Sequence, residues 1–171
     1  MTTFVHIADE RDSAAIRRTG LTLPRGARAA ASGHPVGIFA LPVVPNFLIA
    51  HQWVRELKRR GFKVAVGVYF RVPDTEPVWA GRYNEAKQAV TAAQAFAWLA
   101  REQTLGFEAL IPRSIAAAEI QSVKALPQTL GWRYFPGAHE SGIFCGCPYC
   151  QRGQIKSRRI QLRYEQAQNA R

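Results

Sequence analysis

Residues 106–115 read Gly106-Phe107-Glu108-Ala109-Leu110-Ile111-Pro112-Arg113-Ser114-Ile115, so a carboxylate stands inside an apolar run. Residues 105–111 are predicted to form a short strand, because apolar side chains dominate and Pro112, which cannot donate to a ladder, closes the run. Side chains alternate along a strand, so Glu108 projects to the face opposite Phe107 and Ala109. Burying a carboxylate is costly unless it is paired or the strand lines a cleft. Glu108 is therefore either an edge-strand residue with its head group in water or part of a site.

Length and composition predict one folded domain. The chain has 171 residues, of which 47% are hydrophobic, with four Trp and nine Phe, and this favours a globular protein over a disordered one. No apolar run approaches the roughly 18 residues of a membrane span, and three acidic residues, Asp9, Glu10 and Asp12, stand where a signal peptide would have its apolar core. We therefore expect a cytoplasmic protein with no membrane partner.

Periodicity and turn residues predict many strands and few helices. Strands are expected at residues 2–8, 36–41, 62–72, 77–83, 105–111, 120–126 and 132–135, and helices between Asp9 and Gly20, at 46–60 and at 91–102. Asp9, Asn46 and Thr91 are predicted N-caps, and residues 21–35 a loop. This succession predicts an α+β fold with a split or mixed sheet, residues 1–136, followed by a Cys-rich basic extension, residues 137–171.

Two short motifs precede the Glu108 strand. The first is Phe4-Val5-His6-Ile7-Ala8, followed by Ala15-Ile16 and Gly20-Leu21. The second is Gly37-Ile38-Phe39-Ala40, with Ala50-His51 in the helix after it. Taken singly, His6 is as well explained as a satisfied core or edge histidine and Phe39 as a core residue.

In this order, the motifs and the segment from Glu108 through Ile115 and Ile120 resemble the three motifs of ADP-ribosyltransferases of the diphtheria-toxin and poly(ADP-ribose) polymerase class. The resemblance spans residues 4–123 and implies the fold of that class. It also implies that His6 contacts a ribose hydroxyl of NAD, and that the backbone at Ile7 holds the nicotinamide amide. The sequence departs from the family pattern here, since family members usually carry Gly directly after the His.

The resemblance assigns the remaining site residues as well. Phe39 stands where the family usually has the Tyr that stacks on nicotinamide, and His51 lies near a second stacking position. A rival match to the second motif, Gly67-Val68-Tyr69-Phe70, makes Tyr69 a further NAD-binding candidate. Glu108 is the expected catalytic residue: a fixed carboxylate on the ribose stabilises the positive charge that builds as the bond to nicotinamide breaks.

A cysteine cluster follows the domain. Cys145, Cys147 and Cys150 are close enough to share one ion, and His139 is the nearest fourth ligand, so they predict a structural Cys₃His zinc site. Buried thiols without a ligand and a redox C-x-x-C at 147–150 are the alternatives.

Positive charge is concentrated at the C-terminus. The net charge is +11, and residues 151–171 hold six Lys or Arg and one Glu. A helix from about Gln154 would align Arg152, Lys156, Arg159 and Arg163 on one face, a stripe suited to phosphates. A second basic cluster, Arg55 with residues 58–60, lies before Gly61. A merely solvated surface explains such charge equally well.

The expected function is that of an NAD-dependent mono-ADP-ribosyltransferase, with NAD as substrate, a structural zinc and a nucleic-acid acceptor. Two alternatives stay open. One is a non-enzymatic zinc-containing nucleic-acid-binding module, and the other is RNA 2′-phosphotransferase-like activity on the same fold.

Overall fold

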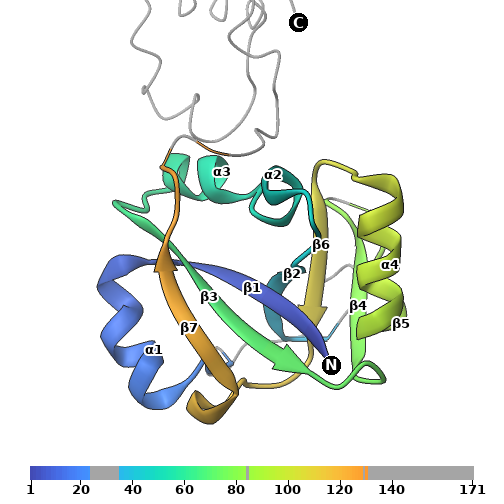
Figure 1. Cartoon of the computed structure of the whole chain (residues 1–171), viewed down its shortest axis with the longest axis horizontal. Helices are drawn as coiled ribbons and strands as arrows, with labels where there is room; N and C mark the ends of the chain where they lie inside the picture. Colours follow the sequence, from blue (N-terminus) through green and yellow to red (C-terminus); the bar gives the residue numbers. More distant parts are fainter. Residues whose placement is uncertain (24–34, 84, 129, 131–171) are drawn as a thin grey trace, which may run out of the picture. The chain divides into compact units, whose positions relative to one another are not determined.

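The computed structural model describes residues 1–23, 35–83, 85–128 and 130 (Figure 1). They belong to one compact unit, Met1–Trp132. Several predictions lie outside the described residues: most of the loop at 21–35, the strand at 132–135, the tail helix, and the candidate zinc and nucleic-acid ligands His139, Cys145, Cys147, Cys150, Arg152, Lys156, Arg159 and Arg163. No helix in the described part of the chain is long and apolar enough to cross a membrane.

Seven strands form one sheet in the order β5-β4-β6-β2-β1-β3-β7, and every pairing between neighbours is antiparallel. The strands are β1 (Thr2–Asp9), β2 (Ile38–Pro42), β3 (Ala65–Val72), β4 (Pro77–Arg82), β5 (Gln88–Thr91), β6 (Phe107–Ile111) and β7 (Ile120–Ala125). Together with the few short helices, this sheet confirms the predicted α+β class. The edge strand β5 was not predicted.

The sheet is divided near its centre. Strand β1 pairs with β3 over its whole length, from Thr2 to Asp9, whereas its register with β2 consists of two pairs, Phe4↔Pro42 and Val5↔Leu41. Beyond Val5 the two strands diverge, and the imidazole of His6 contacts β2 through the carbonyl oxygen of Phe39. We call this divergence the seam. It separates β1, β3 and β7 from β2, β6, β4 and β5.

The helices begin where polar caps predict them. Asp9 caps the short 3-10 helix η1 (Glu10–Asp12), which continues into α1 (Ser13–Thr19). Asn46 caps α2 (Phe47–Ala50), and Thr91 forms a capping box with Gln94 at the start of α4 (Ala92–Glu102). These three caps confirm the predictions from sequence. A second 3-10 helix, η2 (Ala117–Glu119), precedes β7.

The single helix predicted over residues 46–60 is wrong, because the structure has two short helices, α2 and α3 (Val54–Arg59), joined by a turn. The cause lies at Gln52, which is fully buried and whose amide nitrogen donates to the carbonyls of Ile49 and Thr104. Its carbonyl oxygen accepts from the backbone N–H of Gly106. The hydrogen bonds of the Gln52 side chain thus fix the backbone in a turn at the position where a continuous helix would continue. They also connect this turn to the start of β6.

The core follows the sheet. The rings of Phe4 and Phe70 stack at 6.2 Å between centroids, and Phe107 meets Trp98 of α4 edge-on at 5.4 Å. Figure 1 shows α1 beside β7 and α4 beside β4. Leu99 of α4 is fully buried and belongs to the same apolar cluster as these rings. Burial of this apolar surface is the main term that stabilises the fold.

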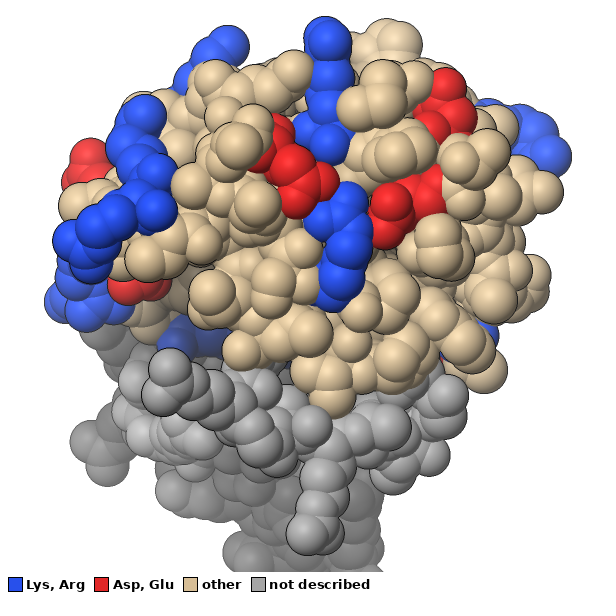
Figure 2. Space-filling view, turned by 90° about the horizontal axis from the view of Figure 1, so that it is seen from below, with Lys and Arg blue, Asp and Glu red and all other residues tan. Residues whose placement is uncertain are grey.

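Some charged side chains of the described residues form ion pairs. Arg113 contacts Glu119 at 2.8 Å and Glu76 at 2.7 Å, and hydrogen bonds to these carboxylates raise the pKa of its guanidinium. Figure 2 shows acidic and basic side chains interspersed over the middle of one face, with basic side chains gathered along its left edge.

Asp9 is expected to make stability depend on pH. Its carboxylate is 2% exposed and accepts hydrogen bonds from Arg11 and from the N–H of Lys63, and these contacts lower its pKa from 3.8 to about 2. A depressed folded-state pKa contributes stability above the unfolded value that is lost as pH falls through the folded value. Asp9→Asn should therefore lower the melting temperature at pH 7, and the difference from wild type should vanish toward pH 2. Asp12→Asn is the control, because Asp12 makes no side-chain cap bond; a melting difference for Asp9→Asn that stays constant over this range would contradict the assignment.

Candidate active site

One pocket contains the candidate catalytic residue. It has a volume of about 270 Å³ and lies between strands β1, β2 and β6 and the region of α3. Its lining comes from five segments of the chain and comprises Val5, Ile7, Phe39, Ala40, Leu41, Trp53, Leu57, Arg60, Tyr83, Glu108 and Ala109. Most of these side chains are apolar, so the few polar groups define what the pocket can bind.

Glu108 enters this pocket from β6. Its side chain is 16% exposed, and Oε2 lies 3.0 Å from Nζ of Lys87, whose side chain is 4% exposed. The alternation predicted from sequence is confirmed, since Phe107 and Ala109 are buried in the core while Glu108 lines the cavity. The head group of Glu108 is thus ion-paired, and its strand lies inside the sheet, between β4 and β2.

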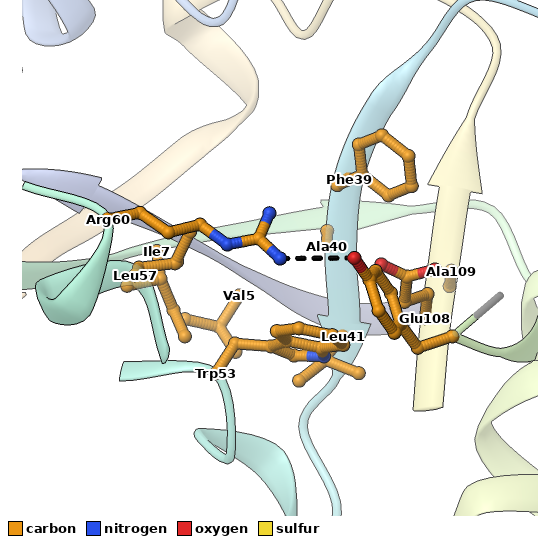
Figure 3. A pocket seen from close by; sticks show the side chains of 11 residues that line it. Val5, Ile7, Phe39, Ala40, Leu41, Trp53, Leu57, Arg60, Glu108 and Ala109 are labelled. Atoms are coloured by element: carbon orange, nitrogen blue, oxygen red, sulfur yellow. Dashed lines mark hydrogen bonds between the residues drawn. The ribbon is translucent and has the colours of Figure 1, made fainter. Parts of the chain in front are cut away.

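Aromatic side chains form two walls of the pocket. Phe39 of β2 is 48% exposed, unusually open for a phenylalanine on a central strand. Trp53 donates from Nε1 to the carbonyl oxygen of Phe107 at 2.7 Å, which fixes the indole, and its ring meets Tyr83 edge-on at 5.4 Å. Figure 3 shows Phe39 and Trp53 on either side of the space in front of Glu108. The pocket therefore offers π faces to a flat ligand.

A cation faces the carboxylate. Arg60, at the C-terminal end of α3, extends into the pocket from the side opposite Glu108 (Figure 3). Its Nη2 donates to the Tyr83 hydroxyl at 3.1 Å, its Nε donates to Glu56 at 3.4 Å, and the guanidinium lies 5.8 Å from the centre of the Tyr83 ring. The pocket thus carries one charge of each sign and suits a ligand with a cationic and an anionic part.

His6 borders a second cavity, which is lined by residues of β1, α1, β2 and the segment 19–22. Phe39 lines this cavity as well as the first. The structure therefore brings Phe39 and Glu108 into one pocket and places His6 in the neighbouring one, across the seam.

The protonation state of His6 follows from its contacts. Burial lowers the pKa of the imidazole below its ordinary value, and the hydrogen bond to Phe39 acts in the opposite direction. The carbonyl oxygen of Phe39 can only accept, so Nδ1 carries the proton and donates over 2.7 Å. In this neutral tautomer, Nε2 is an acceptor for a hydroxyl group.

The backbone of Ile7 faces the seam. The carbonyl oxygen of Thr3 accepts from the N–H of Val43, just beyond β2, at 2.9 Å. Alternate residues of an antiparallel strand direct their main-chain groups to the same neighbour, so those of Ile7 point toward β2 as well. Within the described residues the register of β1 with β2 ends at Val5. Ile7 also contributes its side chain to the Glu108 pocket.

His51 and Tyr69 do not line either cavity. His51 is 1% exposed and uses both ring nitrogens: Nδ1 donates to the carbonyl oxygen of Phe47, and Nε2 accepts from the Tyr69 hydroxyl at 2.7 Å. Burial lowers the pKa of His51 and raises that of Tyr69. The structure brings these two candidate ligands together as a buried pair that stabilises the turn after α2.

The three sequence motifs meet through backbone contacts. Leu21 and Ile115 exchange two hydrogen bonds, at 2.8 and 2.9 Å. A Cβ atom at Gly20 would lie 2.0 Å from the carbonyl oxygen of Ile115, and one at Gly37 would lie 2.5 Å from that of Ile111. Only glycine fits at these two close approaches. The spacing of the motifs in sequence therefore corresponds to a packed arrangement around the seam.

The sequence did not predict Trp53, Tyr83, Arg60 or Lys87 as site residues. Trp53 and Arg60 belong to the predicted helix at 46–60. There, packing of the helix explains Trp53 and surface charge explains Arg60. Tyr83 and Lys87 lie after β4 and reach the site because β4 pairs with β6 (Gly81↔Glu108). Strand pairing between elements distant in sequence has no local signal, so neither residue could have been found from the sequence alone.

No group of three His, Cys, Asp or Glu side chains gathers at a metal-binding distance within the described residues. No protein-family model, curated protein or solved structure matches this chain. The pocket itself combines a fixed carboxylate, aromatic walls and an opposed cation.

Proposed function

We propose that the protein is an NAD-dependent mono-ADP-ribosyltransferase with a nucleic-acid acceptor. The observation that carries this proposal is the position of Glu108, an ion-paired carboxylate in a largely apolar pocket with the exposed ring of Phe39 in its wall. A carboxylate in such surroundings acts strongly on positive charge, because few other dipoles screen it.

The pocket suits the nicotinamide end of NAD. The nicotinamide ring is flat and cationic, so it fits beside Phe39 and Trp53 within reach of Glu108. A phosphate carried by the same ligand would find Arg60 on the opposite side. The main-chain groups of Ile7 facing the seam offer a donor and an acceptor to the carboxamide, and Nε2 of His6 offers an acceptor to a ribose hydroxyl.

Chemically, the bond between C1′ of the ribose and the ring nitrogen breaks, and nicotinamide leaves with the electron pair. The ribose passes through an oxocarbenium-like state whose positive charge is stabilised by the carboxylate of Glu108. An acceptor nitrogen or oxygen then forms the new bond to C1′ and releases its proton.

The proposal of a nucleic-acid acceptor is based on the positive charge of the protein. The net charge of +11 and the basic residues of the tail favour a polyanion. Arg60 places one of the basic residues of the α3 region in the pocket itself. The zinc site proposed for His139, Cys145, Cys147 and Cys150 stays a prediction from sequence.

The test is incubation of the purified protein with labelled NAD and purified DNA or RNA. We expect label to enter the nucleic acid and free nicotinamide to appear in equal amount. Label confined to protein bands and insensitive to nuclease would contradict the acceptor, and the absence of both labelling and nicotinamide release would contradict the transferase.

His6→Ala should weaken NAD binding roughly two- to tenfold, because one hydrogen bond to a ribose hydroxyl is worth about 0.5–1.5 kcal/mol. Titration calorimetry with NAD measures the effect. His51→Gln is the matched control, since His51 is buried away from both cavities. Equal affinities for wild type and His6→Ala would remove His6 from the NAD site.

A further inference from the structure

Lys87 is the side chain in direct contact with the candidate catalytic group, and it is almost completely buried. Its Nζ lies 3.0 Å from Oε2 of Glu108 and its side chain is 4% exposed. Neither the sequence motifs nor the proposed reaction assigns it a role. A buried lysine is rare unless it is paired, so its position calls for a physical explanation.

The ammonium group of Lys87 is held on all sides. It has three N–H donors and three acceptors: the carbonyl oxygens of Arg82 at 2.8 Å and Glu85 at 3.2 Å, and the carboxylate of Glu108. The two carbonyls belong to the turn that follows β4. The turn therefore fixes the position of the ammonium group, and the ammonium group fixes one carboxylate oxygen of Glu108.

The sheet provides room for this contact. Gly81 pairs with Glu108 across β4 and β6, and a Cβ atom at Gly81 would lie 3.2 Å from Cδ of Lys87. The aliphatic part of Lys87 thus covers the position where β4 has no side chain. The ion pair with Lys87 engages Oε2 of Glu108, whose side chain lines the pocket.

We propose that Lys87 is a positioning residue: its ion pair fixes the carboxylate of Glu108 in the pocket. This rests on the proposed function of Glu108. A carboxylate stabilises an oxocarbenium-like state best when it is held in place before the charge develops. Lys87 holds it through the ion pair and does so from outside the ligand's space, since Lys87 is not among the residues that line the pocket.

Other groups facing Glu108 cannot replace Lys87. Arg60 enters from α3, but its donors go to Tyr83 and Glu56 and it stands on the opposite side of the pocket. Tyr83 is engaged by Arg60, and His6 borders the other cavity. The ion pair with Lys87 is the salt bridge that Glu108 makes among the described residues.

The kinetic test is Lys87→Met, which preserves the aliphatic volume and removes the charge. We expect kcat for nicotinamide release to fall on the order of tenfold to a hundredfold at pH 7, with KM for NAD nearly unchanged. Lys87→Arg should restore part of the rate by restoring the charge.

Two comparisons exclude a merely structural role. Lys63→Met changes an exposed lysine and should leave the rate as in wild type. In a Glu108→Gln background, Lys87→Met should cause no further loss, because it acts through Glu108. A loss that is additive with Glu108→Gln would overturn the proposal, and so would a rate equal to or above that of wild type.

A spectroscopic test does not require activity. The infrared difference between wild type and Glu108→Gln should contain the carboxylate band of Glu108, and the position of this band should differ in the Lys87→Met background, where the ion pair is absent. If this shift occurs while the wild type fails to cleave NAD, the proposed function fails and the role of Lys87 stands. The same band position in both backgrounds would overturn the role of Lys87 whatever the activity.

Discussion

Glu108→Gln should reduce nicotinamide release from NAD by about 10²–10³-fold while leaving NAD binding nearly unchanged. The carboxylate acts on charge that develops only as the glycosidic bond breaks, so its loss falls mainly on kcat. This corresponds to about 3–4 kcal/mol of transition-state stabilisation. Steady-state kinetics and calorimetry with NAD measure the two effects separately.

The glutamine variant is preferable to alanine for a structural reason. Its amide oxygen can still accept from Lys87, so the three donors of that ammonium keep their acceptors. Glu108→Ala would leave the buried ammonium group of Lys87 without one of its partners. A loss of activity could then come from unfolding as well as from the missing carboxylate. Glu10→Gln, at an exposed site, is the matched control. Wild-type turnover by Glu108→Gln would exclude the carboxylate from the reaction.

The sequence predicted the framework of the fold because its signals are local. Alternating apolar residues mark the strands, and Asp9, Asn46 and Thr91 cap helical turns as expected. The break between α2 and α3 could not be predicted, since it depends on bonds from Gln52 to Thr104 and Gly106, more than fifty residues away. The same holds for β5, a four-residue edge strand with an unremarkable composition.

Some residues of the candidate site could likewise be predicted from sequence, and others could not. Glu108 could be singled out because a carboxylate in an apolar strand violates the local pattern. Phe39 was selected by its motif, and its exposure agrees with a role at the surface of a pocket. Lys87 and Tyr83 follow ordinary turn residues and gain their positions only through the pairing of β4 with β6. His51 looked equally suitable in sequence, yet Tyr69 and Phe47 occupy both of its ring nitrogens.

The seam explains why residues from separate strands can form a site at all. A fully paired β1 and β2 would bond the main-chain groups of Ile7 and leave no space for the ring of His6 between the strands. Divergence after Val5 makes these groups available, and α1 and the Gly20–Leu21 segment lie against the opened region through the bridge to Ile115. The stability of this bridge is therefore a condition for the geometry of both cavities.

Gly20→Ala should be the most destabilising single-methyl change among the described glycines. Gly20 has φ of +80°, which costs a residue with a side chain about 1–2 kcal/mol, and its Cβ would lie 2.0 Å from the carbonyl oxygen of Ile115. Backbone atoms cannot rotate away, so the bridge between Leu21 and Ile115 must open. We expect a total loss of about 3 kcal/mol or more, seen as a fall of roughly 10 °C in melting temperature.

Gly61→Ala separates the two causes. Gly61 also has a positive φ, +121°, but an added Cβ there would meet no atom within 4 Å. Gly61→Ala should therefore lower the free energy of unfolding only by the cost of the positive φ, about 1–2 kcal/mol. If Gly20→Ala melts no lower than Gly61→Ala, the close approach of Gly20 to Ile115 is not maintained in solution. In that case the bridge does not set the shape of the His6 cavity, and the affinity for NAD should be insensitive to Gly20→Ala as well.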